Sequence, residues 1–214
     1  VQSLADASLP SPFSSNFVTN PSAVWTATKE LRCPVDNWND AMGIARDSAG
    51  NVYVVGKIND AGPFEGVPNQ GGATDLLVLK KFDSAGGAVW TRRWGSDSNG
   101  DWVRGITVDD AGAIYVVGNT SGRMPNVDVD AAGNSDVFVS KFDSIGNVHW
   151  HHQFGTASDD IPNAVAVDPW GYPFVVGQGG DLADAGLTGV FFSKLNPDGG
   201  RLWTVMHGGY NPSG

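Results

Sequence analysis

Two short stretches of this 214-residue chain alternate acidic or amide residues with other residues, a pattern that can bind calcium. Calcium takes six to eight oxygen ligands, often from Asp and Asn at every second loop position. Neither stretch has the full EF-hand spacing or its closing Glu, and Asn and Asp also cap turns. The sequence therefore favours turn capping, with calcium as the one possible cofactor. Asp101 also recurs in the repeat as Asn39 and Asp160, for which a bond to turn backbone is a better explanation than a metal. The candidate ligands are Asp97, Asn99 and Asp101 in DSNGD, and Asn126, Asp128 and Asp130 in NVDVD.

Histidines and one asparagine offer two further kinds of chemistry. In the segment HWHH, His149 and His151 share one face of a predicted strand and His152 points the other way. Zinc needs a third or fourth ligand, and no Cys or carboxylate lies at a suitable spacing, so we expect packing or exposed histidines. The triplet NTS is a glycosylation sequon, which makes Asn119 a candidate glycan acceptor in a predicted loop.

Motifs of the common enzyme classes do not occur in the chain. The nucleophile elbow G-x-S-x-G is missing, and so are the Walker and dinucleotide-binding fingerprints. We therefore predict no catalytic residue and no organic cofactor.

Two sequence motifs each occur three times and reveal how the chain is organised. The first reads DSAGNVYVVG at 47–56, DDAGAIYVVG at 109–118 and DPWGYPFVVG at 168–177. The second reads KFDSAGGAVW at 81–90, KFDSIGNVHW at 141–150 and KLNPDGGRLW at 194–203. A repeat at a fixed period of this size is typical of propellers and other repeat folds.

Each repeat contains four short runs of β-branched and aromatic residues, separated by turns that carry glycine. The first run ends in Asp47, Asp109 or Asp168, which we expect to accept hydrogen bonds from the following turn amides. Recurrent lysines at 81, 141 and 194 could pair with blade carboxylates. The segment from Asp75 to Lys81 is one residue longer than its counterpart, for which a β-bulge is the simplest explanation.

Four antiparallel strands in every sixty residues or so predict an all-β fold of β-propeller blades. We expect three full blades, at about 40–95, 101–155 and 160–209, after an extended Ser/Pro-rich tail at 1–22. The linked motifs GIARDSAGNVYVVG, TDLLVLKKFDSAGGAVWTRRWGS and their copies resemble the SBBP-type β-propeller repeat of large secreted and surface proteins. The resemblance spans about residues 23–214 and implies an extracellular or cell-surface propeller without catalytic residues.

The number of strands does not close a ring. Propellers usually have four to eight blades, and this segment has three. The run VWT at 24–26 repeats VWT at 89–91, so 24–29 is expected to be the outer strand of another blade. Further blades would come from the same, longer polypeptide or from neighbouring subunits.

Charge and composition limit the partners. The net charge of −10 opposes binding to nucleic acid, and no apolar run is long enough to span a membrane. The sequence therefore favours a non-catalytic module for structural assembly or for binding a protein or glycan. Two alternatives stay open. One is a lyase or hydrolase with its site in the variable loops 57–74, 119–135 and 178–188, where Glu65 and Arg123 lie; the other is a calcium-dependent adhesion module.

Overall fold

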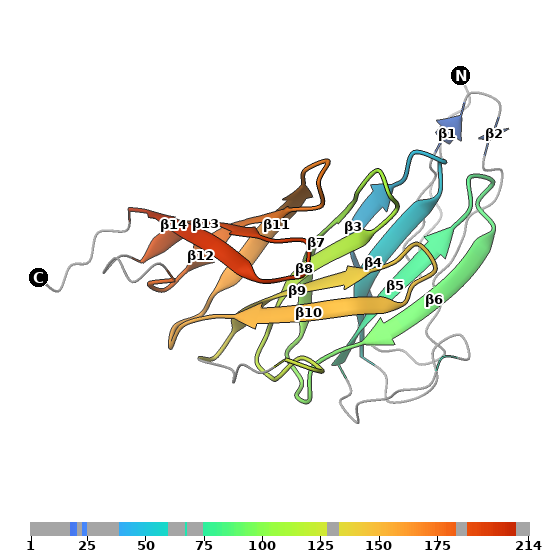
Figure 1. The fold of residues 1–214 in the computed structure, drawn as a ribbon. Coiled ribbons are helices and arrows are strands. Elements are labelled where there is room, and N and C mark those ends of the chain that lie inside the picture. Colours follow the sequence, from blue (N-terminus) through green and yellow to red (C-terminus); the bar gives the residue numbers. More distant parts are fainter. Residues whose placement is uncertain are drawn as a thin grey trace, which may run out of the picture.

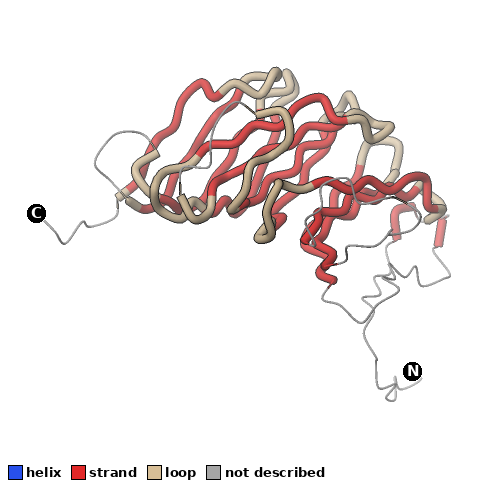
Figure 2. The backbone as a smooth tube through the Cα atoms, turned by 90° about the horizontal axis from the view of Figure 1, so that it is seen from below, coloured by secondary structure: helices blue, strands red, loops and turns tan. Residues whose placement is uncertain are grey.

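The computed structural model describes residues 18–20, 23–24, 39–59, 67, 75–127, 133–182 and 188–208. Every regular element within these ranges is a β-strand, and none of them is a helix (Figure 2). The described part of the chain accordingly holds no helix that could cross a membrane.

Twelve of the strands form three four-stranded antiparallel sheets, which we call the first, second and third blade (Figure 1). In each blade the strands lie in chain order, so sequence neighbours are also spatial neighbours. The first blade contains β3 (Asn39–Arg46), β4 (Val52–Asn59), β5 (Asp75–Phe82) and β6 (Ala88–Trp94). The second contains β7 (Trp102–Val108), β8 (Ile114–Thr120), β9 (Asp136–Phe142) and β10 (Val148–Phe154). The third contains β11 (Ile161–Val167), β12 (Pro173–Gly179), β13 (Gly189–Leu195) and β14 (Arg201–His207).

This architecture confirms the predicted fold class: an all-β chain with three four-stranded blades that do not close into a ring. Near the N-terminus, β1 (Val18–Asn20) pairs with β2 (Ala23–Val24) in a separate two-stranded sheet. Strand pairing therefore reaches into the segment expected to be an extended tail. Trp25 and the rest of the expected outer strand lie outside the described residues.

Glycine fixes the tight turns between strands. Gly112 lies between β7 and β8 with φ +81°, a left-handed conformation that costs other residues free energy. Its amide donates to the carbonyl of Asp109 at 3.0 Å, which closes the turn. The repeated glycine of the first motif is thus explained by backbone geometry.

The expected β-bulge in the longer third strand is not present as predicted. β4 and β5 pair without interruption from Val52↔Phe82 to Asn59↔Asp75, because both strands are one residue longer than their counterparts. Bulges do occur between the third and fourth strands, but at the same place in all three blades. The extra residue therefore lengthens a strand pair.

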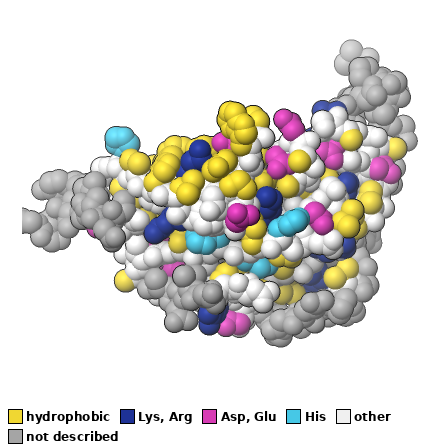
Figure 3. Space-filling model, viewed as in Figure 1, with side chains coloured by type: hydrophobic (Ala, Val, Ile, Leu, Met, Phe, Trp, Pro, Cys, Tyr) yellow, Lys and Arg dark blue, Asp and Glu magenta, His cyan; other side chains and the backbone are white. Residues whose placement is uncertain are grey.

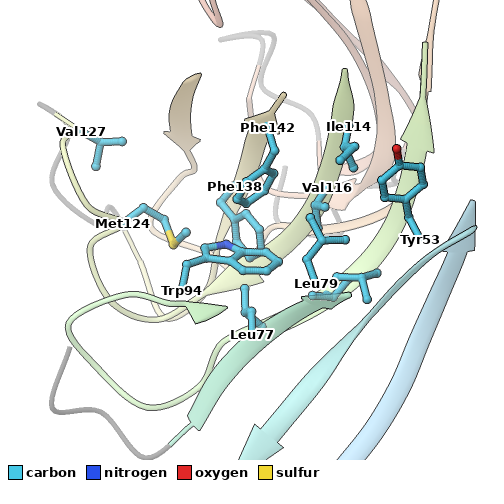
Figure 4. Packing of buried hydrophobic residues seen from close by; sticks show 12 residues of the cluster. Tyr53, Leu77, Leu79, Trp94, Ile114, Val116, Met124, Val127, Phe138 and Phe142 are labelled. Carbon is cyan, nitrogen blue, oxygen red and sulfur yellow. The ribbon is translucent and has the colours of Figure 1, made fainter. Parts of the chain in front are cut away.

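The hydrophobic core lies between blades. β7 lies between β3 and β11, so the first strands line the common side of the three sheets. Between the first and second blade, the Trp94 ring packs edge-on against Phe142 with centroids 5.0 Å apart, next to Leu77 and Phe138 (Figure 4). A second cluster joins the second blade to the third. Neighbouring blades are thus stabilised by burying the two faces that meet between them.

Candidate functional site

The carboxylates that end the first strands bind the turns that follow them. Oδ1 of Asp109 accepts hydrogen bonds from the amides of Ala111 at 3.0 Å and Ala113 at 2.8 Å. Asp168 does the same for Trp170 and Tyr172, at 3.0 and 2.9 Å. This confirms the predicted role of these aspartates, because a carboxylate that satisfies turn amides in every blade serves the fold.

The other carboxylate oxygen is also used. In the first blade, Oδ2 of Asp47 accepts from the Tyr53 hydroxyl at 3.0 Å and from Nδ2 of Asn51 at 2.7 Å. Partial burial alone would raise the pKa of Asp47, but the hydrogen bonds from Asn51 and Tyr53 outweigh it and hold the pKa below its usual value. Burial and the neighbouring carboxylate raise the pKa of Tyr53. The pair is therefore a stable ion–phenol contact, without a group ready to transfer a proton near neutral pH.

The recurrent lysines only partly follow the expectation that they pair with carboxylates. Lys194 does so, with Nζ 3.8 Å from Oδ2 of Asp168. Lys81 and Lys141 instead reach the following blade, where they donate to the main-chain carbonyls of Ser144 at 3.0 Å and Pro197 at 3.1 Å.

The outer-strand tryptophans donate to the same two carbonyls. Nε1 of Trp90 lies 3.4 Å from the Ser144 oxygen, and Nε1 of Trp150 lies 3.0 Å from the Pro197 oxygen. Each Trp is also the register partner of the lysine on the neighbouring strand. Sequence reasoning missed this paired contact, although the recurrence of Lys and Trp at equivalent positions was a visible signal.

Asp101, a predicted calcium ligand, is fully buried and bound within the protein. Its carboxylate accepts from the Ser96 amide at 2.6 Å and the Ser96 hydroxyl at 2.8 Å. Burial raises the pKa of Asp101, although hydrogen bonds from Thr120 and Ser96 act against this. Asp160 repeats the arrangement in the next linker, where it binds Thr156 and the amide of Gly180. The two carboxylates hold the linkers between blades.

The described calcium candidates other than Asp101 are bound to, or lie in, turns of the chain. Oδ1 of Asp97 accepts from the amide of Arg123 at 2.8 Å, and the Asn99 carbonyl accepts from the Ser121 hydroxyl at 2.8 Å. Asn126 lies in a turn with φ +57°, while 128–130 lie outside the described residues. Within the described ranges, no group of three or more His, Cys, Asp or Glu residues is placed to hold a metal ion.

The three histidines of strand β10 lie in different surroundings. His149 is exposed in the bulge of β10, whereas Nδ1 of His151 shares a 2.8 Å hydrogen bond with the hydroxyl of its register partner Ser140 within the second blade. His152 lies beside Phe154, with ring centroids 5.5 Å apart. Burial lowers the pKa of both His151 and His152 to about 4. Both imidazoles are therefore neutral packing groups at neutral pH.

The structure corrects the predicted position of the sequon. Asn119 lies in strand β8, not in a loop, and is 5% exposed. Its Oδ1 accepts from Nε of Arg104 and its Nδ2 donates to the Ser135 hydroxyl, both at 2.8 Å. Nδ2 is the atom that a glycan would occupy, so in the folded chain it already has a protein partner.

One of the two candidate catalytic residues of the variable loops is held in place by its own loop. Nε and Nη2 of Arg123 both donate to the Val127 carbonyl, at 3.0 and 2.7 Å. Glu65 lies outside the described residues.

Several large hydrophobic side chains are exposed on the outer face of the third blade. In the first blade Leu77 and Leu79 point toward the second blade and are fully buried. The equivalent residues of the third blade, Val190 and Phe192, are 52% and 43% exposed. Phe192 stacks on Phe174 with centroids 5.8 Å apart. Hydrophobic side chains gather over the strands of this blade in Figure 3. We call this surface the open face; its members are Phe174, Val176, Val190, Phe192, Lys194, Trp203 and Val205.

Comparison with known proteins supports the assignment of the repeat. Residues 41–65 and 89–123 match the sequence model of the SBBP beta-propeller repeat, which confirms the predicted resemblance. None of the curated proteins matches the chain. Among solved structures, an ACO/RPE65 chimera in a monoclinic crystal form is similar over 83% of this chain, with 10% sequence identity and a TM-score of 0.41. The similar region spans 40% of that chain.

Proposed function

From the match of residues 41–65 and 89–123 to the SBBP beta-propeller repeat, we propose a non-catalytic structural module: a segment of a larger propeller that acts by assembling with further blades. The observation that carries this proposal is the use of the recurrent polar side chains. Asp109 binds its own turn, Asp101 binds its own linker, and Lys141 binds the next blade. Groups committed to backbone hydrogen bonds in this way are unsuited to turnover.

The open face supports the assembly role. An apolar surface of this kind on a soluble sheet marks a contact with another protein surface. The negative charge of the chain disfavours polyanionic ligands, so a glycan partner of the module would be neutral or basic. We place the module outside the cell or on its surface, because the repeat resembles those of secreted and surface proteins.

The proposal is tested with a hydrophobic dye such as anilinonaphthalene sulfonate. The chain is expected to bind the dye, and Val205→Lys on the open face is expected to remove most of the fluorescence. Val89→Lys is the matched control, because Val89 lies on an outer strand with 52% exposure, close to the 51% of Val205. Equal dye binding by the parent and both variants would refute an assembly surface.

Catalysis is tested in parallel with a panel of polysaccharides that includes a polyuronate. A module without catalytic activity releases no reducing ends and no unsaturated product. Product formation that Arg123→Ala abolishes would instead establish the lyase or hydrolase alternative.

A further inference from the structure

Two interfaces in this chain show how one blade recognises the next. In both, a lysine of the third strand and a tryptophan of the fourth strand donate to one main-chain carbonyl of the following blade. That carbonyl always belongs to the second residue of the turn between the third and fourth strands: Ser144 in DSIG and Pro197 in NPDG.

The turn that supplies the carbonyl is held in a fixed shape. Asp143 accepts from the amides of Ile145 and Asn147, and Asn196 accepts from those of Asp198 and Gly200, at 2.8 to 3.0 Å. The side chain of Asp143 or Asn196 thus satisfies the turn amides. The main-chain carbonyl of the residue that follows it, Ser144 or Pro197, is available to donors of the preceding blade.

The glycine of this turn is favoured both by its own left-handed backbone conformation and by the close approach of the preceding blade. Gly199 has φ +93°, and a Cβ there would lie 2.9 Å from the Trp150 ring. A Cβ at Gly146 would lie 2.9 Å from Nε of Arg92. The recognition element is therefore an Asp/Asn-x-x-Gly turn on which the preceding blade's aromatic or cationic side chain lies.

The third blade carries the same donor pair on its open face. Lys194 and Trp203 are register partners, as Lys81 and Trp90 are. No described carbonyl of a following blade lies near them: Trp203 is 40% exposed, and Nζ of Lys194 lies 3.8 Å from Oδ2 of Asp168 in its own blade and 4.5 Å from the centre of the Tyr172 ring.

We propose that the open face binds a further blade of the same repeat, supplied by the same polypeptide, and that Lys194 and Trp203 recognise the main-chain carbonyl of its Asp/Asn-x-x-Gly turn. This inference rests on the proposed assembly function and names its partner. The apolar side chains supply contact area, as Leu77 and Leu79 do in the first interface, and the two donors set the register of the incoming blade.

A second copy of this chain fits the open face less well than an additional blade does. The opposite face of the first blade would have to take the role of an incoming surface. Its residues Ile58, Leu76 and Val78 are already buried, at 2–4% exposure, and form a cluster of their own. They are therefore not available for another chain without rearrangement.

The test appends a copy of residues 95–154, the second blade with its preceding linker, directly after His207. A single thiol is introduced by Val205→Cys in a Cys33→Ser background, and its rate of alkylation is measured with and without the appended blade. We expect the appended blade to slow labelling at least about tenfold, because labelling then requires the blade to open. A thiol introduced by Ser158→Cys, at an exposed turn, is the control whose rate should not change.

The recognition step is tested by Lys194→Met with Trp203→Phe in the appended chain. Loss of both donors is expected to raise the labelling rate roughly tenfold, while Trp170→Phe, at an exposed turn tryptophan, leaves it unchanged. Protection that survives the double substitution would overturn the recognition role of the donors and leave the assembly function standing. No protection by the appended blade would overturn both. Concentration-dependent protection of the chain without an appended blade would identify a second copy as the occupant and overturn our choice of partner.

Discussion

The contact between the second and third blades allows a quantitative test of the donor pair. Trp150 and Lys141 donate to the same Pro197 carbonyl, at 3.0 and 3.1 Å. Trp150→Phe removes one donor, worth about 1 kcal/mol, and a part of the buried ring, worth about 0.5 kcal/mol. Lys141→Met keeps the aliphatic stem and removes the other donor, also for about 1 kcal/mol.

The two changes should not be additive. After either single substitution the Pro197 carbonyl keeps one donor, whereas the double substitution leaves a partly buried carbonyl without a protein partner. An unsatisfied buried acceptor costs about 1–3 kcal/mol, and we expect the lower value here because water reaches part of the site. The double variant should therefore lose about 1 kcal/mol more than the sum of the singles.

The assay is guanidinium unfolding followed by circular dichroism, with free energies of unfolding compared in a double-mutant cycle. The third blade provides the matched cycle, Trp203→Phe with Lys194→Met, at equivalent register positions on the open face. That cycle should be nearly additive, with each single change costing under about 1 kcal/mol. An additive cycle at Trp150 and Lys141, or one of equal size in the third blade, would refute the shared-acceptor argument.

Three further predictions concern the buried polar groups and the acidic loops. Asp101→Ala should lower the free energy of unfolding by about 2–4 kcal/mol, because it leaves the Ser96 amide without its acceptor. Asp97→Ala should lower it by under about 1 kcal/mol, and equal losses in denaturant titrations would contradict this. Stability should fall as the pH drops from about 6.5 to 4, because the unfolded chain protonates its histidines there while His151 and His152 stay neutral in the fold. His152→Gln should make this profile shallower, and parallel profiles of parent and variant would disprove the assignment. A chelator should leave the melting temperature unchanged in a thermal scan, since the Asp101 carboxylate is bound to protein donors; a fall of several degrees would instead support the calcium-dependent adhesion module.

Local signals in the sequence were sufficient to predict the blades. Gly112 and its equivalents fix the turns, and the acidic residue before each turn is explained by hydrogen bonds within a few residues. The position of Asn119 was predicted wrongly because its sequon overlaps the end of a strand whose side-chain partners are distant in sequence. The bulge was predicted wrongly because a count along one strand does not reveal that its neighbour is longer too.

The contacts between blades could not be derived in the same way. Lys141 and Trp150 donate to a main-chain carbonyl. Every residue carries such a carbonyl, so no residue type in the sequence marks the acceptor. The recurrence of the donors is visible, but their acceptor lies about fifty residues further along the chain and is defined by the shape of a turn.

The direction of these contacts has a consequence for synthesis. In both interfaces the donors belong to the earlier blade and the acceptor to the later one, so a blade that has just left the ribosome shows its apolar face until its successor is made. The nascent protein therefore always carries one temporarily uncovered sheet at its growing end. In the third blade, Lys194 lies over the rings of Tyr172 and Phe174, next to Asp168, and places a positive charge on that face near the turn end of β13. A charge at this position opposes pairing with other apolar sheets during the interval, and the same side chain turns to its carbonyl acceptor once the next blade arrives.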